Sequence, residues 1–112
     1  MKKIFLMIGI LVVLLLVLAK IYVNATNDEK VMLGDVTGDG LIQTDDAKQI
    51  LEIYARVQTG GSSYTEKELK TGDIDKNGTI NALDASELLT FITTEALNET
   101  GELTLEKFIE ER

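Results

Sequence analysis

The chain has 112 residues, no histidine, no cysteine and a formal net charge of −8. The lack of cysteine excludes disulfides, and the lack of both residue types excludes most nucleophile–base pairs and most transition-metal sites. The acidity lies after residue 25, because residues 26–112 contain 8 lysines and arginines against 19 aspartates and glutamates, a net charge of −11. Such a surface repels nucleic-acid phosphates and attracts divalent cations, so we expect no nucleic acid among the partners.

The N-terminal 25 residues have the pattern of a membrane-targeting segment. Lys2 and Lys3 precede a run of 20 residues, Ile4 to Val23, in which Lys20 is the one charged residue. A helix of that length spans the ~30 Å hydrocarbon core of a bilayer. The length favours an uncleaved signal anchor, with the lysines in the cytoplasm and the C-terminal domain outside the cell. A signal peptide cleaved before Thr26 is the alternative.

Two acidic segments, 35–46 and 73–84, repeat the same pattern 38 residues apart. Each places oxygen-bearing side chains at positions 1, 3, 5, 9 and 12 and a glycine at position 6, as an EF-hand-type calcium loop does. The predicted ligands of the first loop are Asp35, Thr37, Asp39, the backbone carbonyl of Leu41, Gln43 and Asp46. Those of the second are Asp73, Asp75, Asn77, the backbone carbonyl of Thr79, Asn81 and Asp84.

The duplication decides between calcium and a simple turn. A single acidic loop of this kind often marks only an Asx-rich turn. Here two copies match in register, and each has an isoleucine at position 8 (Ile42 and Ile80) and an aspartate at position 12. We therefore expect two Ca²⁺ ions. The second site should bind more tightly, because Thr37 offers a hydroxyl where Asp75 offers a carboxylate.

Helical periodicity follows each loop. Apolar residues recur at helical spacing from Asp46 to just before Gly60, and again from Asp84 to just before Asn98. Leu89 counts among the apolar face of the second helix, and Leu51 flanks that of the first. Short helices are expected at about 66–70 and at 103–111, the latter with a frayed tail as its alternative. The fold class is all-α, a pair of calcium loop–helix repeats after an N-terminal hydrophobic helix.

The duplicated segment resembles the type I dockerin family. The family's mark is Gly-Asp-x-(Asn/Asp)-x-(Asp/Asn)-Gly-x-Ile-x-x-x-Asp ahead of a helix. The chain has it in full at 72–84, and at 34–46 with Thr37 in place of the first Asn/Asp. The leading glycine, the aspartate at position 12 and the absence of a helix before the first loop favour dockerin over an ordinary EF-hand pair. The expected organisation is a signal anchor or signal peptide at 1–25, a linker at 26–32, a dockerin-like domain at 33–97, and a short C-terminal helix or tail at 98–112.

The resemblance implies a function, since dockerins bind cohesin domains and attach enzymes to polysaccharide-degrading complexes. It implies a calcium-dependent docking module with a cohesin-like partner and no small-molecule substrate. The family's contact positions correspond here to Thr44, Asp45, Ala82, Leu83, Glu87 and Thr90. The second copy is more apolar, with Ala82 and Leu83 where the first has Thr44 and Asp45, so the second is expected to be the one preferred binding face. A surface calcium-binding structural domain without a cohesin partner is the alternative.

An enzyme is not expected. Paired carboxylates can hydrolyse glycosides, but the candidate carboxylates of this chain are already assigned to calcium. A domain of under 90 residues is also too small to form a sugar-binding cleft around them.

Overall fold

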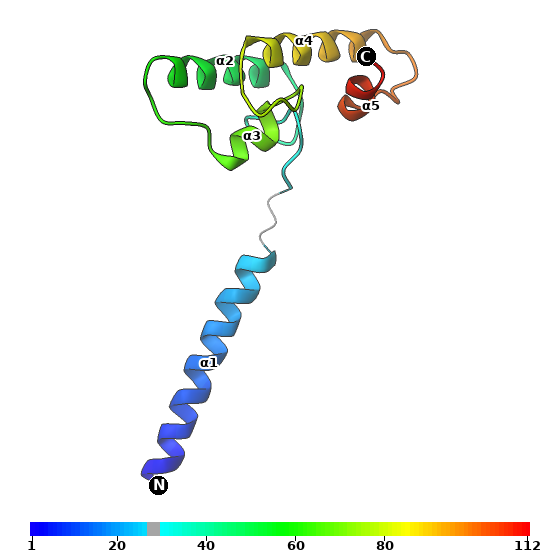
Figure 1. Cartoon of the computed structure of the whole chain (residues 1–112). Helices are drawn as coiled ribbons and strands as arrows, with labels where there is room; N and C mark the ends of the chain where they lie inside the picture. The colour runs from blue at the N-terminus through cyan, green and yellow to red at the C-terminus, as the bar shows by residue number, and fades with distance from the viewer. Residues whose placement is uncertain (27–29) are drawn as a thin grey trace. The chain divides into compact units, whose positions relative to one another are not determined.

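The computed structural model describes residues 1–26 and 30–112 (Figure 1). They form two compact units, Met1–Lys30 and Val31–Arg112. All regular secondary structure in the described residues is helical, which confirms the predicted all-α class.

The first unit contains helix α1, Lys2–Thr26. Its apolar side chains from Ile4 to Tyr22 are exposed, so this helix has no protein core to face. The stretch Lys2–Tyr22 has a mean hydropathy of 3.1 and is long and apolar enough to cross a membrane. A signal sequence meets the same criteria of length and composition.

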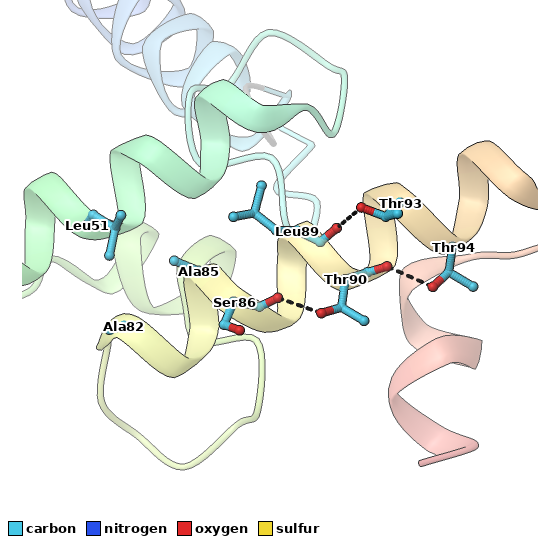
Figure 2. A pocket seen from close by; sticks show the side chains of 8 residues that line it. All are labelled: Leu51, Ala82, Ala85, Ser86, Leu89, Thr90, Thr93 and Thr94. Atoms are coloured by element: carbon cyan, nitrogen blue, oxygen red, sulfur yellow. Dashed lines mark hydrogen bonds between the residues drawn. The ribbon is translucent and has the colours of Figure 1, made fainter.

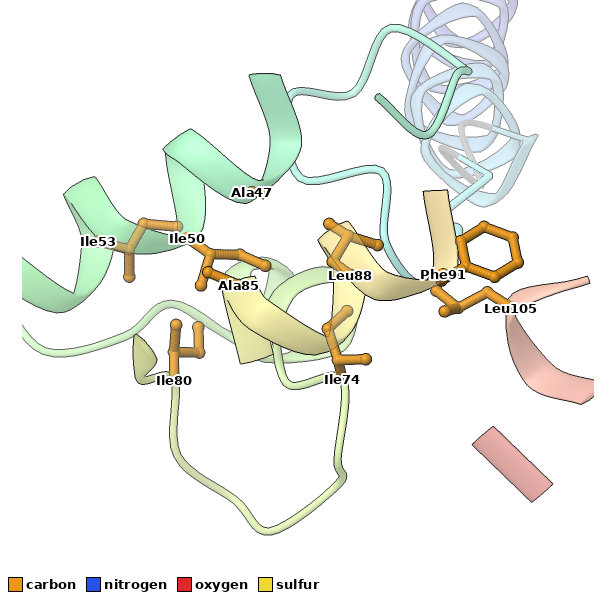
Figure 3. Close-up of a cluster of buried hydrophobic side chains, with 9 residues drawn as sticks. All are labelled: Ala47, Ile50, Ile53, Ile74, Ile80, Ala85, Leu88, Phe91 and Leu105. Atoms are coloured by element: carbon orange, nitrogen blue, oxygen red, sulfur yellow. The ribbon is translucent and has the colours of Figure 1, made fainter. Parts of the chain in front are cut away.

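The second unit is built on two long helices, α2 (Thr44–Gln58) and α4 (Ala82–Leu97), which pack against each other. Each follows one acidic loop, and the two helices contribute residues from matching positions of the repeat to a single core (Figure 3). The buried core residues are Ala47, Ile50, Ile53, Ile74, Ile80, Ala85, Leu88, Phe91 and Leu105. The repeat therefore does what its sequence predicts, because the apolar face of each helix covers that of the other.

The two long helices begin two residues earlier than predicted. Gln43 and Asn81 are their N-caps, and Asp46 and Asp84 occupy the third helical position rather than the first. Each aspartate accepts a hydrogen bond from the backbone N–H of its N-cap residue, at 2.8 Å in both repeats. These bonds are one arm of a capping box, and this arrangement lets the helix start inside the loop.

A short helix follows each long one: α3 (Glu66–Gly72) after α2, and α5 (Leu105–Glu110) after α4. Each has a threonine N-cap, Thr65 or Thr104, whose hydroxyl oxygen accepts a backbone N–H three residues on. Both short helices differ from their predicted bounds by one or two residues.

Each short helix is tied to its long helix by an ion pair. Arg56 of α2 makes two hydrogen bonds, of 2.9 and 2.7 Å, to Glu68 of α3. These bonds, opposed by burial, lower the pKa of Glu68 to about 2. Glu87 of α4 forms an ion pair through one carboxylate oxygen with Arg112, just after α5. Each half of the unit therefore has an ion pair between its long helix and the region of its short helix.

Helix α5 completes the core. Leu105 is 2% exposed, and its Cδ2 atom would lie only 2.7 Å from a Cβ added at Gly34. The ring of Phe108 packs against that of Phe91, with centroids 5.7 Å apart. A small domain without disulfides has little core to spare, so we expect this helix to carry a substantial part of the stability.

Replacing Leu105 with alanine should destabilise the second unit by about 2–5 kcal/mol, because it empties a fully enclosed site beside Gly34. The matched control is Leu97→Ala at a side chain that is 77% exposed, which should change stability by less than about 0.5 kcal/mol. Urea unfolding of the full chain in mild detergent, followed by circular dichroism, measures both. Equal effects of the two substitutions would show that α5 is not part of the core.

Candidate calcium sites and the adjoining helix face

The second loop gathers three carboxylates around one point. Asp73, Asp75 and Asp84 each offer an oxygen, and these oxygens all lie within 4.8 Å of one another. In the part of the chain that the structure describes, this is the one cluster of three or more acidic residues drawn so close. Three like charges at this separation repel unless a cation neutralises them.

Asp84 is the buried member of the cluster. One carboxylate oxygen accepts hydrogen bonds from the backbone N–H groups of Ile74 (2.8 Å) and Asp75 (3.2 Å), and the other accepts from Asn81 (2.8 Å). Burial raises the pKa of Asp84, the backbone hydrogen bonds oppose that shift, and the nearby charge of Asp75 adds to it. A divalent cation beside the carboxylate would oppose the effects of burial and of Asp75, because its positive charge favours the ionised form of Asp84.

The backbone of the second loop turns around Asp73. Its carboxylate accepts hydrogen bonds from the N–H groups of Asn77 (3.1 Å) and Gly78 (2.8 Å). Gly78 has φ +88°, a conformation that glycine adopts at least cost. The amide oxygens of the two remaining predicted side-chain ligands are engaged locally: that of Asn77 accepts from Thr79, and that of Asn81 caps α4 at Leu83.

The first loop has a similar pattern of backbone hydrogen bonds to its aspartates, but one ligand position has a different functional group. Asp35 is 5% exposed and accepts the N–H groups of Gly38, Asp39 and Gly40 at 2.8–3.1 Å. Asp46, 1% exposed, accepts both the N–H (2.9 Å) and the hydroxyl (3.0 Å) of Thr37. Where the second loop has a carboxylate at position 3, the first therefore has a hydroxyl that donates to the position-12 carboxylate.

The donor sets fit calcium. Calcium prefers six to eight oxygen ligands at flexible distances and rarely takes nitrogen or sulfur. Both loops offer carboxylate, amide and carbonyl oxygens from the residues predicted by the spacing, and the first loop adds the hydroxyl of Thr37. In the second loop, positions 1, 3 and 12 already lie together. In the first, Asp39 points its carboxylate to the N–H of Leu41, at 2.9 Å.

Beside the loops, the two long helices form an open groove of about 500 Å³ (Figure 2). The lining residues are Leu51, Ala82, Ala85, Ser86, Leu89, Thr90, Thr93 and Thr94, and none of these eight side chains is charged. Leu51 and Leu89 occupy the same position in the two repeats and remain 44% and 41% exposed. The expectation that Leu89 is buried was wrong, because the helices meet through Ala85 and Leu88 and leave this flank open.

The threonines of the groove use their hydroxyl protons internally. Thr90, Thr93 and Thr94 donate to the carbonyl oxygens of Ser86, Leu89 and Thr90, at 2.8–2.9 Å. A threonine bonded in this way offers a ligand its methyl group and its oxygen lone pairs, but no proton. The groove is therefore apolar with hydrogen-bond acceptors.

The predicted partner-contact residues differ in how they are presented. Thr44, Asp45, Ala82, Leu83 and Thr90 are exposed. Glu87 departs from the expectation of an exposed contact, since its side chain is 13% exposed and paired with Arg112. The sequence did not predict a partner for Glu87, because Arg112 lies beyond the expected C-terminal helix and only the tertiary fold brings the two residues together. Sequence reasoning also missed Leu51, Ser86, Leu89 and Thr93 as groove residues; the signal that could have found them is a leucine at matching positions of the two repeats.

Comparison with known families identifies the unit that carries this geometry. The sequence model of the type I dockerin domain matches residues 33–93, more than half of the chain. The chain belongs to the type I dockerin family. No curated protein matches the sequence. Dockerin domains are non-catalytic modules that bind calcium and dock onto cohesins, so this dockerin domain is a docking module rather than a hydrolase. Helix α5 lies beyond the matched residues.

Replacing Thr37 with aspartate should raise the calcium affinity of the first loop by about tenfold, because it restores a carboxylate at position 3. Calorimetric titration of the full chain in detergent measures the change. Ser63→Asp, in the exposed connector between α2 and α3, adds the same charge outside both loops and serves as the control for the first-loop affinity. An affinity gain of equal size in the control, or none in Thr37→Asp, would contradict the assignment.

Proposed function

We propose that this dockerin domain binds two Ca²⁺ ions, one in each acidic loop, and docks onto a cohesin-type domain through the groove flank of α4. The observation that carries the proposal is the position of Asp84. This aspartate belongs to the three-carboxylate cluster and is also the third residue of α4, so an ion at the cluster is joined directly to the helix that lines the groove.

Calcium would act on the docking face through the start of α4. Ala82 and Leu83 are loop residues 10 and 11, directly before Asp84, and both are exposed. The carboxylate of Asp84 accepts hydrogen bonds from the backbone N–H groups of Ile74 and Asn81. An ion bound to that carboxylate neutralises the cluster, so the loop and the first turn of the helix keep one geometry. The docking face is then present only when the loop is filled.

The groove indicates what the partner's surface offers. Apolar side chains should fill the space over Leu51 and Leu89, and hydrogen-bond donors should meet the threonine oxygens, whose own protons are used within α4. The corresponding face of α2 carries Lys48 and Glu52, an exposed ion pair of 3.5 Å. Covering those charges costs desolvation energy, so we propose the second copy as the preferred face.

The organisation of the chain follows from this reading. We propose a signal anchor at 1–25 that displays the dockerin domain (33–97) outside the cell through a linker at 26–32, with residues 98–112 as an added C-terminal helix. The exposed apolar side chains of α1 support the anchor. Because dockerins attach proteins to polysaccharide-degrading complexes, we propose that setting for the partner.

A docking experiment tests the face and the ion together. A panel of cohesin domains should include one that binds the full chain in calcium, with binding lost on adding chelator. Leu89→Glu should weaken that binding at least about 100-fold, since it buries a charge in the groove. The control is Thr44→Glu on the first copy, which should change affinity by less than about threefold. Binding that survives the chelator would contradict the proposal, and so would equal losses in both variants. A chain that binds calcium but no cohesin would be a calcium-binding structural domain.

The membrane proposal has its own measurement. The uncleaved chain should stay in the membrane fraction at high salt and alkaline pH and leave it only with detergent, because α1 buries its apolar side chains in lipid. Protease added outside intact cells should remove the dockerin domain. A mature chain whose N-terminal residue is Thr26 would contradict the anchor and establish the cleaved signal peptide instead.

A further inference from the structure

A basic side chain from the region of a short helix lies beside the first calcium loop, and another pairs with the helix that follows the second loop. At the first loop, the Nζ atom of Lys67, in α3, is 3.8 Å from where a Cβ of Gly38 would stand. Gly38 is the fourth loop residue, and its N–H donates to the carboxylate of Asp35 at 2.8 Å. The ammonium group therefore lies beside the backbone that wraps the first predicted ligand.

At the second loop, Lys76 belongs to the loop itself, and the basic residue from the region of a short helix is Arg112. It pairs with Glu87, which stands one helical turn after Asp84 on α4. Its guanidinium also lies over the ring of Phe108, 5.7 Å from the centroid. The hydrogen bond to Glu87 is the main cause that raises the pKa of Arg112; burial opposes it, and the charges of Glu87 and Asp75 add to it. Asp75 is the position-3 carboxylate of the cluster.

We propose that Lys67 and Arg112 are resident counter-charges of the two calcium loops, which hold the acidic loops together when calcium is scarce and lower the affinity of each loop for the ion. This inference rests on the proposed function, because it assumes that both loops bind calcium. It assigns the short helices a role: α3 and α5 set the calcium concentration at which the docking face forms.

The sign of the effect follows from Coulomb's law. A fixed positive charge near a loop attracts its carboxylates and repels an incoming divalent ion, so it stabilises the empty loop relative to the filled one. By linkage, the ion weakens the hold of the basic residue as much as the basic residue weakens binding of the ion. At separations of several ångströms in a partly exposed site, the expected change in affinity is roughly threefold to tenfold.

The chain offers matched controls on the same short helices. Lys70 of α3 is exposed and pairs with Glu66 at 2.6 Å, and Lys107 of α5 is also exposed. Removing either lysine changes the net charge by the same amount as removing Lys67 or Arg112. Any difference between test and control variants therefore reports the position of the charge, not the total.

The test uses calcium titration of the full chain in detergent, with the amide resonances of Gly40 and Gly78 as separate reporters of the two loops. Lys67→Gln should tighten binding at Gly40, and Arg112→Gln at Gly78, each by roughly threefold to tenfold at low salt. Both gains should shrink in 0.5 M salt, where the screening length falls to about 4 Å. Lys70→Gln and Lys107→Gln should leave both affinities unchanged within about 1.5-fold.

One further variant separates electrostatics from structure. Glu87→Gln breaks the same ion pair as Arg112→Gln but removes a negative charge, so it should weaken calcium binding at Gly78. Were the pair only structural, both substitutions would shift the affinity in the same direction, and that result would overturn the inference. Unshifted affinities in Lys67→Gln and Arg112→Gln would overturn it as well, while leaving the proposed function intact. A wild-type chain that takes up no calcium at either loop would overturn both.

Discussion

The buried carboxylate at the third position of each long helix is the constraint on which the second unit depends. Asp46 and Asp84 are 1% and 0% exposed, and a carboxylate so enclosed is stable only with hydrogen bonds or an opposite charge around it. Both receive backbone N–H groups from the start of their loop and from their helix N-cap. One side chain thus closes the loop, caps the helix and presents an oxygen to the ion site. Loop geometry and helix geometry cannot change independently as a result.

That coupling explains why so small a core suffices. With no disulfide available, the domain must limit the freedom of its chain by other means. The short helices supply two of them, since Arg56–Glu68 and Glu87–Arg112 fasten α3 and α5 to the long helices. A third is Tyr64, whose hydroxyl donates to the carbonyl of Ile80 at 3.0 Å and anchors the connector to the second loop. The Tyr64 contact ends on the second loop itself, and Glu87 stands one helical turn after Asp84, so these two contacts couple the stability of the unit to the second loop.

Much of this arrangement could be predicted from the sequence. The spacing of oxygen-bearing residues and the glycine at position 6 predicted both loops, and the 38-residue repeat predicted two helices that cover each other. These features depend on local chemistry and periodicity, which a sequence displays directly. The membership in the dockerin family, predicted from the same motif, is confirmed.

The features that escaped prediction depend on tertiary contacts. Periodicity places Leu89 on the apolar half of α4, but only the crossing of α2 and α4 decides which edge of that half is covered. Helix starts were displaced because the capping residues Gln43 and Asn81 belong to the loops as well as to the helices. Helix α5 was predicted with a frayed tail as its alternative, but its place in the core was not, since nothing local shows that Leu105 finds an enclosed site beside Gly34.

The two repeats share one backbone plan, so their difference as docking surfaces lies in side-chain charge. The groove lies between both helices and contains a leucine from each, so its apolar part is shared by the faces of the two repeats. Around those leucines, however, α2 has Lys48 and Glu52 where α4 has Ser86 and Thr90. Desolvating a charged pair is costly even when the charges are mutually bonded, whereas threonines bonded within their helix lose little on being covered. In the proposed docking mode, the residues beside the leucines therefore select the face that a partner covers, and the leucines supply apolar contact to either face.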